Sequence, residues 1–342
     1  MEEKKPKADI SHFEAGLSEM IGQRQVIDPL LVYVRAYRNI KSGSSNPTVS
    51  FGPSLFTGPS GVGKTMIAKA LHKELGHREL VETNGLMLNN RFQLFSILIC
   101  ADSDTTVFID EAHGMNSKAQ QILLTALSEK KLFVSSSISS DRSCTIPLAN
   151  FTMIFATTDE HMLQGPLLNR MRICCKFEYY SVKDLVEIVR QRANALNWQY
   201  ESDGVLRIIA RGAKGTPRLA LNRNLETCWY VTISHNRNVI TLQDVYEAFH
   251  HLQIDEFGLD KRDRSYLMLL CEGGPSKLCV LSSRLSLPSL TLQRVLEPYL
   301  LKEGLVIQDD SSMRAITRKG RQYLETTSPL FGQARIGEAH GI

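Results

Sequence analysis

The residues best suited to chemistry lie in the segment Gly58-Pro-Ser-Gly-Val-Gly-Lys64-Thr65, which fits the phosphate-loop pattern G-x-x-x-x-G-K-[ST]. Glycines allow successive backbone N–H groups to close around phosphate oxygens, and the N-terminus of a following helix adds partial positive charge. We expect Lys64 to reach the β- and γ-phosphates and the Thr65 hydroxyl to bind Mg²⁺. The segment therefore predicts that the chain binds a nucleoside triphosphate. The expected contacts are Gly58, Pro59, Ser60, Gly61, Val62, Gly63, Lys64, Thr65 and Met66.

An acidic motif follows at Thr106-Val-Phe-Ile-Asp110-Glu111, where an apolar run ends in two carboxylates, as in a Walker B strand. We expect Asp110 to hold the metal through water, because Mg²⁺ gives up its hydration shell reluctantly. We expect Glu111 to orient and polarise the attacking water, which phosphoryl transfer requires more than covalent chemistry. An exposed acidic strand end is the usual alternative for such a pair. Behind a phosphate loop, the pair instead indicates hydrolysis of the nucleotide.

The elements that must position these residues alternate along the chain. Apolar runs predict buried strands at 54–57, 106–109 and 151–155, and helical spacing of apolar residues predicts helices after Thr65 and before residue 131. Residues 131–134 and 144–148 predict a β-hairpin with a serine-rich tip. This alternation implies a largely parallel α/β sheet that extends to about residue 180.

Two further units are predicted beyond residue 180. Helical spacing prevails from Ser181 to about residue 254, which indicates a small helical domain. A third unit then combines three helix-like segments with a hairpin around the turn at 309–312. That combination is a winged helix-turn-helix, a geometry that binds DNA in many proteins and serves protein contacts in others. Its last helix has an apolar stripe formed by Leu292, Val295, Leu296, Tyr299 and Leu300.

Length and composition limit the number of domains and the class of protein. A length of 342 residues predicts two or three domains, and 43% hydrophobic with 22% charged residues is ordinary for a globular protein. The net charge of +4 permits nucleic-acid binding without arguing for it. Seven cysteines without a C-x-x-C pair indicate a reducing, cytoplasmic setting and buried thiols, including the adjacent Cys174 and Cys175. No apolar run reaches the ~20 residues needed to span a bilayer, and the charged N-terminus is not typical of a signal peptide.

The order of these parts resembles the RuvB family, the Holliday-junction branch-migration motors of the AAA+ superfamily, over about residues 12–325. The resemblance implies ATP and Mg²⁺ as ligands and five regions: a leader at 1–11, a large P-loop AAA+ ATPase domain at 12–180, a small helical lid at 181–255, a winged-helix domain at 256–326 and a flexible tail at 327–342. It depends on Glu19-Met-Ile-Gly-Gln23, Phe56–Thr65, Phe108-Ile-Asp-Glu-Ala-His113, Phe155-Ala-Thr-Thr158, Pro166-Leu-Leu-Asn-Arg170, Lys214-Gly-Thr-Pro-Arg218, Phe257-Gly-Leu-Asp260 and Val295–Gly304.

The same resemblance implies roles for single residues. Thr158 resembles sensor 1, which bonds to the attacking water or the γ-phosphate, and Arg218 resembles sensor 2. Arg170 resembles the arginine finger that acts in trans on a neighbouring subunit's γ-phosphate, with the nearby Arg172 as the competing candidate. Ile21, Gly22 and Tyr180 resemble the adenine contacts, and His113 resembles a supporting or core histidine rather than a catalyst.

Two surfaces depart from the family pattern. The family's wing turn has a basic Thr-Pro-Arg-Gly-Arg run that holds DNA phosphates, whereas this chain has Gln308-Asp-Asp-Ser-Ser-Met-Arg314. Carboxylates there repel a phosphate backbone, so DNA contact would rely on Arg314, Arg318, Lys319 and Arg321. The hairpin at 132–148 is where the family binds its partner RuvA through an apolar surface, and here the only large apolar residue of the tip is Ile138.

Three functions follow as hypotheses. The first is a hexameric ring, or a helical filament, that hydrolyses ATP to move duplex or junction DNA. The second is an ATP-switched recruitment or regulatory protein of a mobile element or defence system, without translocation. The third is a matchmaker that resembles a clamp loader. A protein partner is expected at the hairpin, and no membrane association is expected.

Overall fold

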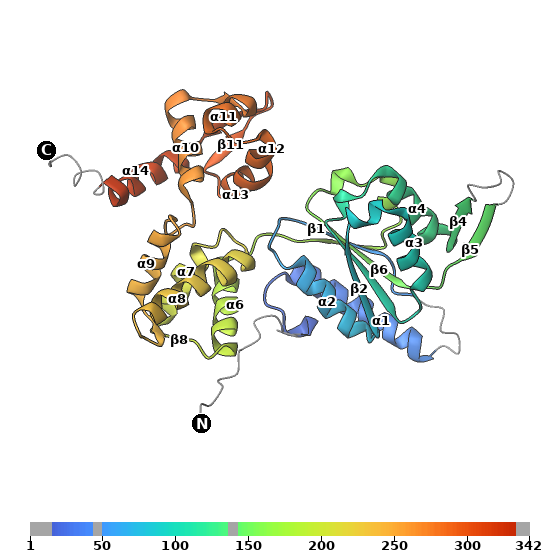
Figure 1. The fold of residues 1–342 in the computed structure, drawn as a ribbon. Coiled ribbons are helices and arrows are strands. Elements are labelled where there is room, and N and C mark those ends of the chain that lie inside the picture. Colours follow the sequence, from blue (N-terminus) through green and yellow to red (C-terminus); the bar gives the residue numbers. More distant parts are fainter. Residues whose placement is uncertain (1–15, 44–49, 136–142, 333–342) are drawn as a thin grey trace. The chain divides into compact units, whose positions relative to one another are not determined.

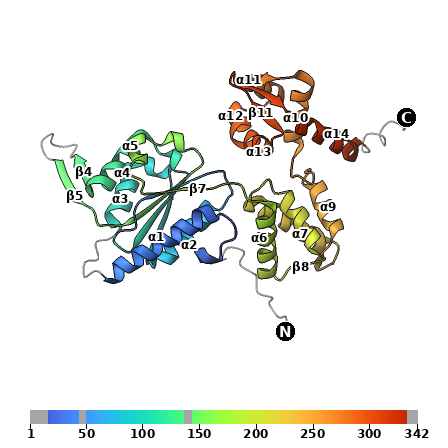
Figure 2. The same ribbon diagram turned by 180° about the vertical axis from the view of Figure 1, so that it is seen from behind.

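The computed structural model describes residues 16–43, 50–135 and 143–332. The chain forms two compact units, one of residues 1–188 with 216–218 and one of residues 189–215 with 219–342. The predicted leader at 1–11, the serine-rich hairpin tip with Ile138, and the last ten residues lie outside the described residues. Figures 1 and 2 show the fold from opposite sides.

The first unit is built on a five-stranded parallel sheet with the order β2-β3-β6-β1-β7. The helices α1 and α2 cover one face of the sheet, and α3 and α4 cover the other (Figures 1 and 2). The strands are β1 (Ser54–Thr57), β2 (Glu79–Asn84), β3 (Thr105–Asp110), β6 (Thr152–Thr157) and β7 (Ile173–Lys176). The helices are α1 (Arg24–Gly43), α2 (Lys64–Leu75), α3 (Arg91–Cys100), α4 (Ser117–Glu129) and α5 (Gly165–Leu168), with short 3₁₀ turns at Leu17–Glu19, Met87–Asn89, Ala112–Gly114 and Glu160–Met162.

The predicted strands are confirmed because their apolar runs are fully buried in the sheet. Every residue of β6, the central strand, is buried, and the α3–α4 face packs Leu98, Leu123 and Phe155 into one core cluster. The prediction of buried thiols holds for Cys175 and Cys228 and is wrong for the four exposed cysteines, Cys100, Cys144, Cys174 and Cys279. Burial raises the pKa of the Cys175 thiol to about 12. Cys174 is exposed because the two-residue period of β7 sends adjacent side chains to opposite faces.

The predicted hairpin is also present. Its strands β4 (Lys131–Ser135) and β5 (Ser143–Pro147) pair antiparallel and form a sheet of their own, separate from the parallel sheet.

The second unit begins with the small helical domain. It contains α6 (Val182–Ala195), which starts in the first unit, α7 (Asp203–Arg211), a π-helical segment over Leu219–Leu225, α8 (Glu226–Ser234) and α9 (Leu242–His251). A short parallel pair, β8 (Gln199–Tyr200) with β9 (Val239–Ile240), was not predicted, because two residues give no periodic signal.

The winged helix is confirmed, with a three-stranded antiparallel sheet in the order β10-β12-β11. Its elements are α10 (Lys261–Gly273), β10 (Ser276–Lys277), α11 (Leu278–Leu285), α12 (Ser289–Thr291), a π-helical segment over Leu292–Leu296, α13 (Glu297–Lys302), β11 (Val306–Gln308), β12 (Met313–Ile316) and α14 (Arg318–Gly332).

Two expectations for this domain need correction. Val295 does not belong to the buried stripe, because it is 68% exposed while Leu292, Leu296 and Leu300 are buried. The helix α14 continues to Gly332, so the first six residues of the predicted tail are helical. Among the described residues, no helix combines the length and the apolar character that a membrane span requires.

Candidate nucleotide-binding and hydrolysis site

The phosphate loop connects β1 to α2 and needs glycine at three positions. Gly58, Gly61 and Gly63 have φ values of +144°, +79° and +95°, which residues with a side chain rarely adopt. A Cβ atom at Gly58 would also lie 2.4 Å from the carbonyl oxygen of Phe177. The 12-residue helix α2 starts at Lys64, directly after this loop, so its free N–H groups face the position of a phosphate.

Lys64 is buried in the loop, with 7% of its surface exposed. Its Nζ donates to the carbonyl oxygens of Gly58 at 2.7 Å and Pro59 at 2.8 Å. An ammonium group has three N–H donors, so two hold the loop and the third remains for a phosphate oxygen. Desolvation lowers the pKa of Lys64, and the charges of Glu111 and Asp110 oppose that shift.

The expected metal ligands lie together at the carboxyl edge of the sheet. The Thr65 hydroxyl donates to Asp110 Oδ2 at 3.0 Å, and Asp110 Oδ1 accepts from the backbone N–H of Glu111 at 2.9 Å. A hydroxyl beside a carboxylate suits Mg²⁺, which prefers oxygen ligands and keeps several waters. In the described ranges, no group of three or more His, Cys, Asp and Glu side chains could hold a metal ion.

The hydrolytic residues occupy the ends of two neighbouring strands. Glu111 directly follows β3 with a left-handed φ of +45°, and its Oε2 lies 3.2 Å from His113 Nδ1. Thr158 directly follows β6, and its hydroxyl donates to Asp159 Oδ2 at 3.1 Å. Because β3 and β6 pair in parallel, the structure brings Glu111 and Thr158 to one edge. Sequence reasoning missed Asp159, whose charge acts on Lys64; its position after the sensor-like threonine was the only signal.

Arg218 also lies at this edge. Its Nη1 donates to Ser60 Oγ at 3.1 Å, its backbone N–H donates to the Gly61 carbonyl at 3.3 Å, and a Cβ at Gly61 would come within 3.1 Å of its Cβ. Residues 216–218 accordingly group with the first unit although their sequence neighbours belong to the second. The guanidinium is therefore beside the phosphate loop, as the resemblance implied.

Arg170 and Arg172 are not brought to this site. Arg170 is exposed after α5, and Arg172 donates its backbone N–H to Pro53 while its side chain packs against Gly52. Both arginines precede β7, at the amino edge of the sheet, whereas the phosphate loop follows β1 at the carboxyl edge. The four residues of β1 put about 13 Å of strand between the two edges.

Two of the three residues expected to contact adenine, Gly22 and Tyr180, lie against each other. Gly22 has a φ of +72°, and a Cβ there would lie 2.6 Å from the ring of Tyr180, so the two residues are in close contact. Gln23 fixes the chain before Tyr180, because its amide donates to the Glu178 carbonyl at 2.6 Å and accepts from the Glu178 N–H at 3.3 Å. Burial raises the pKa of Tyr180 to about 12. Ile21 is half-buried and Met66 is 42% exposed.

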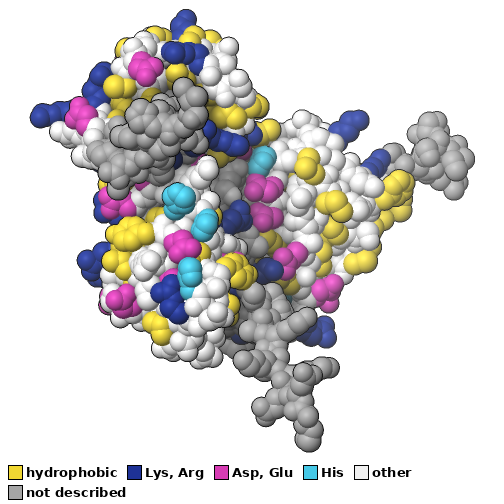
Figure 3. All heavy atoms as spheres, turned by 60° about the vertical axis from the view of Figure 1, so that its left-hand side comes forward, with side chains coloured by type: hydrophobic (Ala, Val, Ile, Leu, Met, Phe, Trp, Pro, Cys, Tyr) yellow, Lys and Arg dark blue, Asp and Glu magenta, His cyan; other side chains and the backbone are white. Residues whose placement is uncertain are grey.

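The winged-helix turn differs from expectation. Arg314 is 5% exposed and holds Glu297 through Nε at 3.0 Å and Nη2 at 3.2 Å, while the Tyr266 hydroxyl donates to the same carboxylate at 2.7 Å. The expectation that Arg314 reaches DNA is therefore wrong. Lys319 Nζ donates to the Glu303 carbonyl. Figure 3 shows the Lys and Arg side chains of this domain, in dark blue, scattered over the visible face.

Three RuvB family models match consecutive parts of the chain. Residues 14–177 match the model of the Holliday junction DNA helicase RuvB P-loop domain, residues 180–255 the RuvB AAA lid domain, and residues 256–325 the RuvB C-terminal winged helix domain. The Holliday junction branch migration complex subunit RuvB of Pseudothermotoga lettingae is 33% identical over 320 residues, which is 92% of this chain and 90% of that protein. The subunit of the same name from Paramagnetospirillum magneticum is 32% identical over 326 residues, covering 94% and 91%.

Solved structures agree with these matches. The structure of the Thermotoga maritima RuvB Holliday junction branch migration motor superposes with a TM-score of 0.77 at 29% identity. The superposition covers 91% of this chain and 97% of that one.

Proposed function

Because this chain belongs to the RuvB family, we propose that it is an oligomeric AAA+ motor that hydrolyses ATP and acts on duplex or junction DNA in the cytoplasm. The observation that carries this proposal is the convergence of Lys64, Asp110, Glu111 and Arg218 on one edge of the sheet. The recruitment and matchmaker hypotheses are not favoured, since the RuvB matches extend through the lid and the winged helix.

Each residue of the site has a defined task in this function. The loop from Gly58 to Thr65 binds the phosphates, and Lys64 and Arg218 neutralise their charge. Glu111 orients the attacking water, and Thr158 bonds to that water or to the γ-phosphate. Thr65 and Asp110 would hold Mg²⁺, which supplies Lewis-acid stabilisation of the phosphate charge. Ile21, Gly22 and Tyr180 form the surface against adenine.

The position of Arg170 supports assembly. A side chain at the amino edge of the sheet cannot contact the phosphate loop of its own chain, because that loop lies at the carboxyl edge. We therefore assign Arg170 to the γ-phosphate of a neighbouring subunit. An interface that joins one edge of a subunit to the opposite edge of the next is head-to-tail, and it generates a ring or a helical filament. A hexameric ring is the form that we propose.

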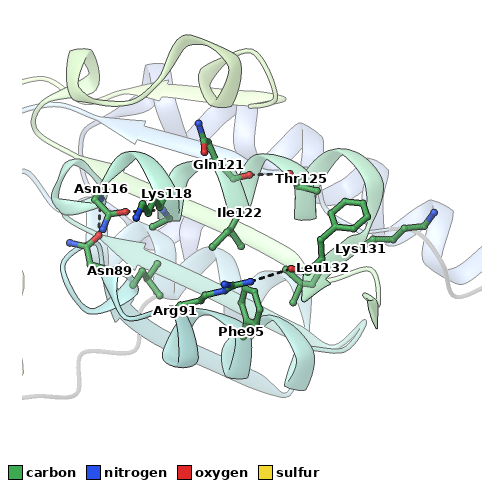
Figure 4. A pocket seen from close by; sticks show the side chains of 13 residues that line it. Asn89, Arg91, Phe95, Asn116, Lys118, Gln121, Ile122, Thr125, Lys131 and Leu132 are labelled. Carbon is green, nitrogen blue, oxygen red and sulfur yellow. Dashed lines mark hydrogen bonds between the residues drawn. The ribbon is translucent and has the colours of Figure 1, made fainter. Parts of the chain in front are cut away.

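A protein partner fits beside the hairpin. A cavity of about 320 Å³ lies between α3, α4 and β4, with Phe95, Ile122 and Leu132 in its apolar wall (Figure 4). Phe133 on β4 lines it too and is 48% exposed, so the body of the hairpin offers the apolar surface that its serine-rich tip lacks. The charged residues around the cavity are the cations Arg91, Lys118 and Lys131. We propose that a partner binds here through apolar and acidic side chains.

The test of the function is ATP hydrolysis with and without duplex or four-way junction DNA, across a salt titration. A motor that tracks the phosphate backbone should be strongly stimulated by DNA, and the stimulation should fall steeply with salt because binding releases counterions. Hydrolysis that is indifferent to DNA at every salt concentration would contradict the motor and favour the recruitment hypothesis.

A further inference from the structure

His113 connects the hydrolytic glutamate to the neighbouring strand. It lies in the 3₁₀ turn Ala112–Gly114 that follows β3, and its side chain is mostly buried. Its Nδ1 lies 3.2 Å from Glu111 Oε2 and 3.1 Å from the hydroxyl oxygen of Thr157. Thr157 is fully buried as the last residue of β6 and lies beside Thr57 of β1 in register. His113 Nδ1 therefore lies between the half-exposed carboxylate of Glu111 and Thr157, a buried residue of the sheet.

Nδ1 is the ring nitrogen that faces both partners. Its hydrogen bond is to the Thr157 hydroxyl, in which either group can donate according to the imidazole tautomer, and Glu111 Oε2 lies beside this bond in a 3.2 Å polar contact. Thr157 Oγ1 also accepts from the backbone N–H of Asp159 at 3.0 Å. The other ring nitrogen, Nε2, lies 3.9 Å from Asp159 Oδ2, which is beyond hydrogen-bond distance. His113 thus faces Glu111 through Nδ1.

Glu111 needs such a partner. Its side chain is 48% exposed and stands on a left-handed backbone whose N–H is already held by Asp110. An exposed carboxylate without a second contact samples several rotamers, only some of which can orient a water for attack. We propose that His113 is a positioning residue that fixes the Glu111 carboxylate relative to the end of β6, where Thr158 and Asp159 lie. This role rests on the proposed ATPase function.

Three substitutions isolate the role. His113→Leu keeps bulk without a polar ring nitrogen, His113→Asn places an amide nitrogen near the position of Nδ1, and His113→Gln places it one bond too far. In the full-length protein, kcat for ATP should fall about tenfold in His113→Leu and His113→Gln, as for other orienting partners, and largely recover in His113→Asn. The Kd for a fluorescent ATP analogue should stay within about twofold in all three, because the polar contacts of His113 in the described part of the chain are with Glu111, Thr157 and Asp159, outside the phosphate loop.

A double mutant supplies the matched control. Glu111→Gln alone should lower kcat by about 10²–10⁴, the usual contribution of a general base. Since His113 acts only through Glu111, adding His113→Leu to Glu111→Gln should cost nothing further.

Several results would overturn the role. These are a wild-type kcat in His113→Leu, a higher kcat, equal kcat values in the Asn and Gln variants, additive losses in the double mutant, or a loss confined to nucleotide affinity. The comparison of the Asn and Gln variants decides the matter even where His113→Leu fails to fold. An inactive wild-type protein would instead overturn the proposed function on which the role depends.

Discussion

The phosphate-loop edge and the winged-helix turn use charged side chains in opposite ways. At the loop, the Lys64 ammonium donates two of its three hydrogen bonds to backbone carbonyls and Glu111 is half exposed, so both charged groups can act on a phosphate. At the turn, Arg314 is buried against Glu297, and the charges that face solvent are those of Asp309 and Asp310. The difference indicates that the ATPase chemistry of the family is kept while a surface that faces DNA in the family has changed.

The largest effect should come from the loop itself. Lys64→Ala removes the only cation inside the loop and leaves the carbonyls of Gly58 and Pro59 without their donor. Nucleotide binding should be lost, as measured by titration with a fluorescent ATP analogue. Lys69→Ala is the matched control, because Lys69 lies on the same helix but is exposed and paired with Glu82. Binding that survives in Lys64→Ala would contradict the loop assignment.

The next effect tests whether sites are shared between subunits. Arg170→Ala should slow hydrolysis by about 10³–10⁵, as for other arginine fingers. Mixing Arg170→Ala protein with Lys64→Ala protein should restore activity, because each chain supplies what its neighbour lacks. Arg172→Ala should retain activity, since that side chain packs on Gly52. No recovery at any ratio, despite co-assembly, would show that Arg170 is only structural.

The contrast between the two regions also explains what could be predicted from sequence. The strands, the winged helix and the phosphate loop were predictable because burial and phosphate binding restrict residue type at fixed spacing, as at Gly58 and Lys64. The buried position of Arg314 could not be predicted, because its partner Glu297 is 17 residues away and no local pattern pairs the two. The prediction that Val295 is buried failed for a related reason. Apolar spacing predicts a helix, but it does not determine which side of the apolar stripe the rest of the domain covers. The contacts of Asp159 and His113 likewise depend on the pairing of β3 with β6.

A smaller effect should separate structural from DNA-binding arginines. Arg314→Ala leaves Glu297 buried without its cation, which typically costs about 3–5 kcal/mol of stability. Chemical denaturation should show the winged-helix transition shifted to lower denaturant. Arg318→Ala, an exposed residue of α14, should leave that transition in place. Equal stability of the two variants would contradict a structural role for Arg314.

The smallest effect concerns the acidic turn and decides whether the wing touches DNA. Asp309 is part of the turn, because its carboxylate accepts from the Ser311 hydroxyl and from the Met313 N–H, both at 2.8 Å. Its replacement would change the turn as well as the charge.

Asp310 is exposed, so Asp310→Arg changes the charge alone. If phosphates approach the wing, duplex affinity should rise a few-fold, and the slope of log K against log salt should steepen by about 0.9 for one added contact. Asp310→Asn is the control, since it removes the repulsion without adding a contact and should raise affinity with little change in slope. An unchanged affinity and slope in both variants would remove the wing from the DNA path, leaving DNA contact to other surfaces of the motor.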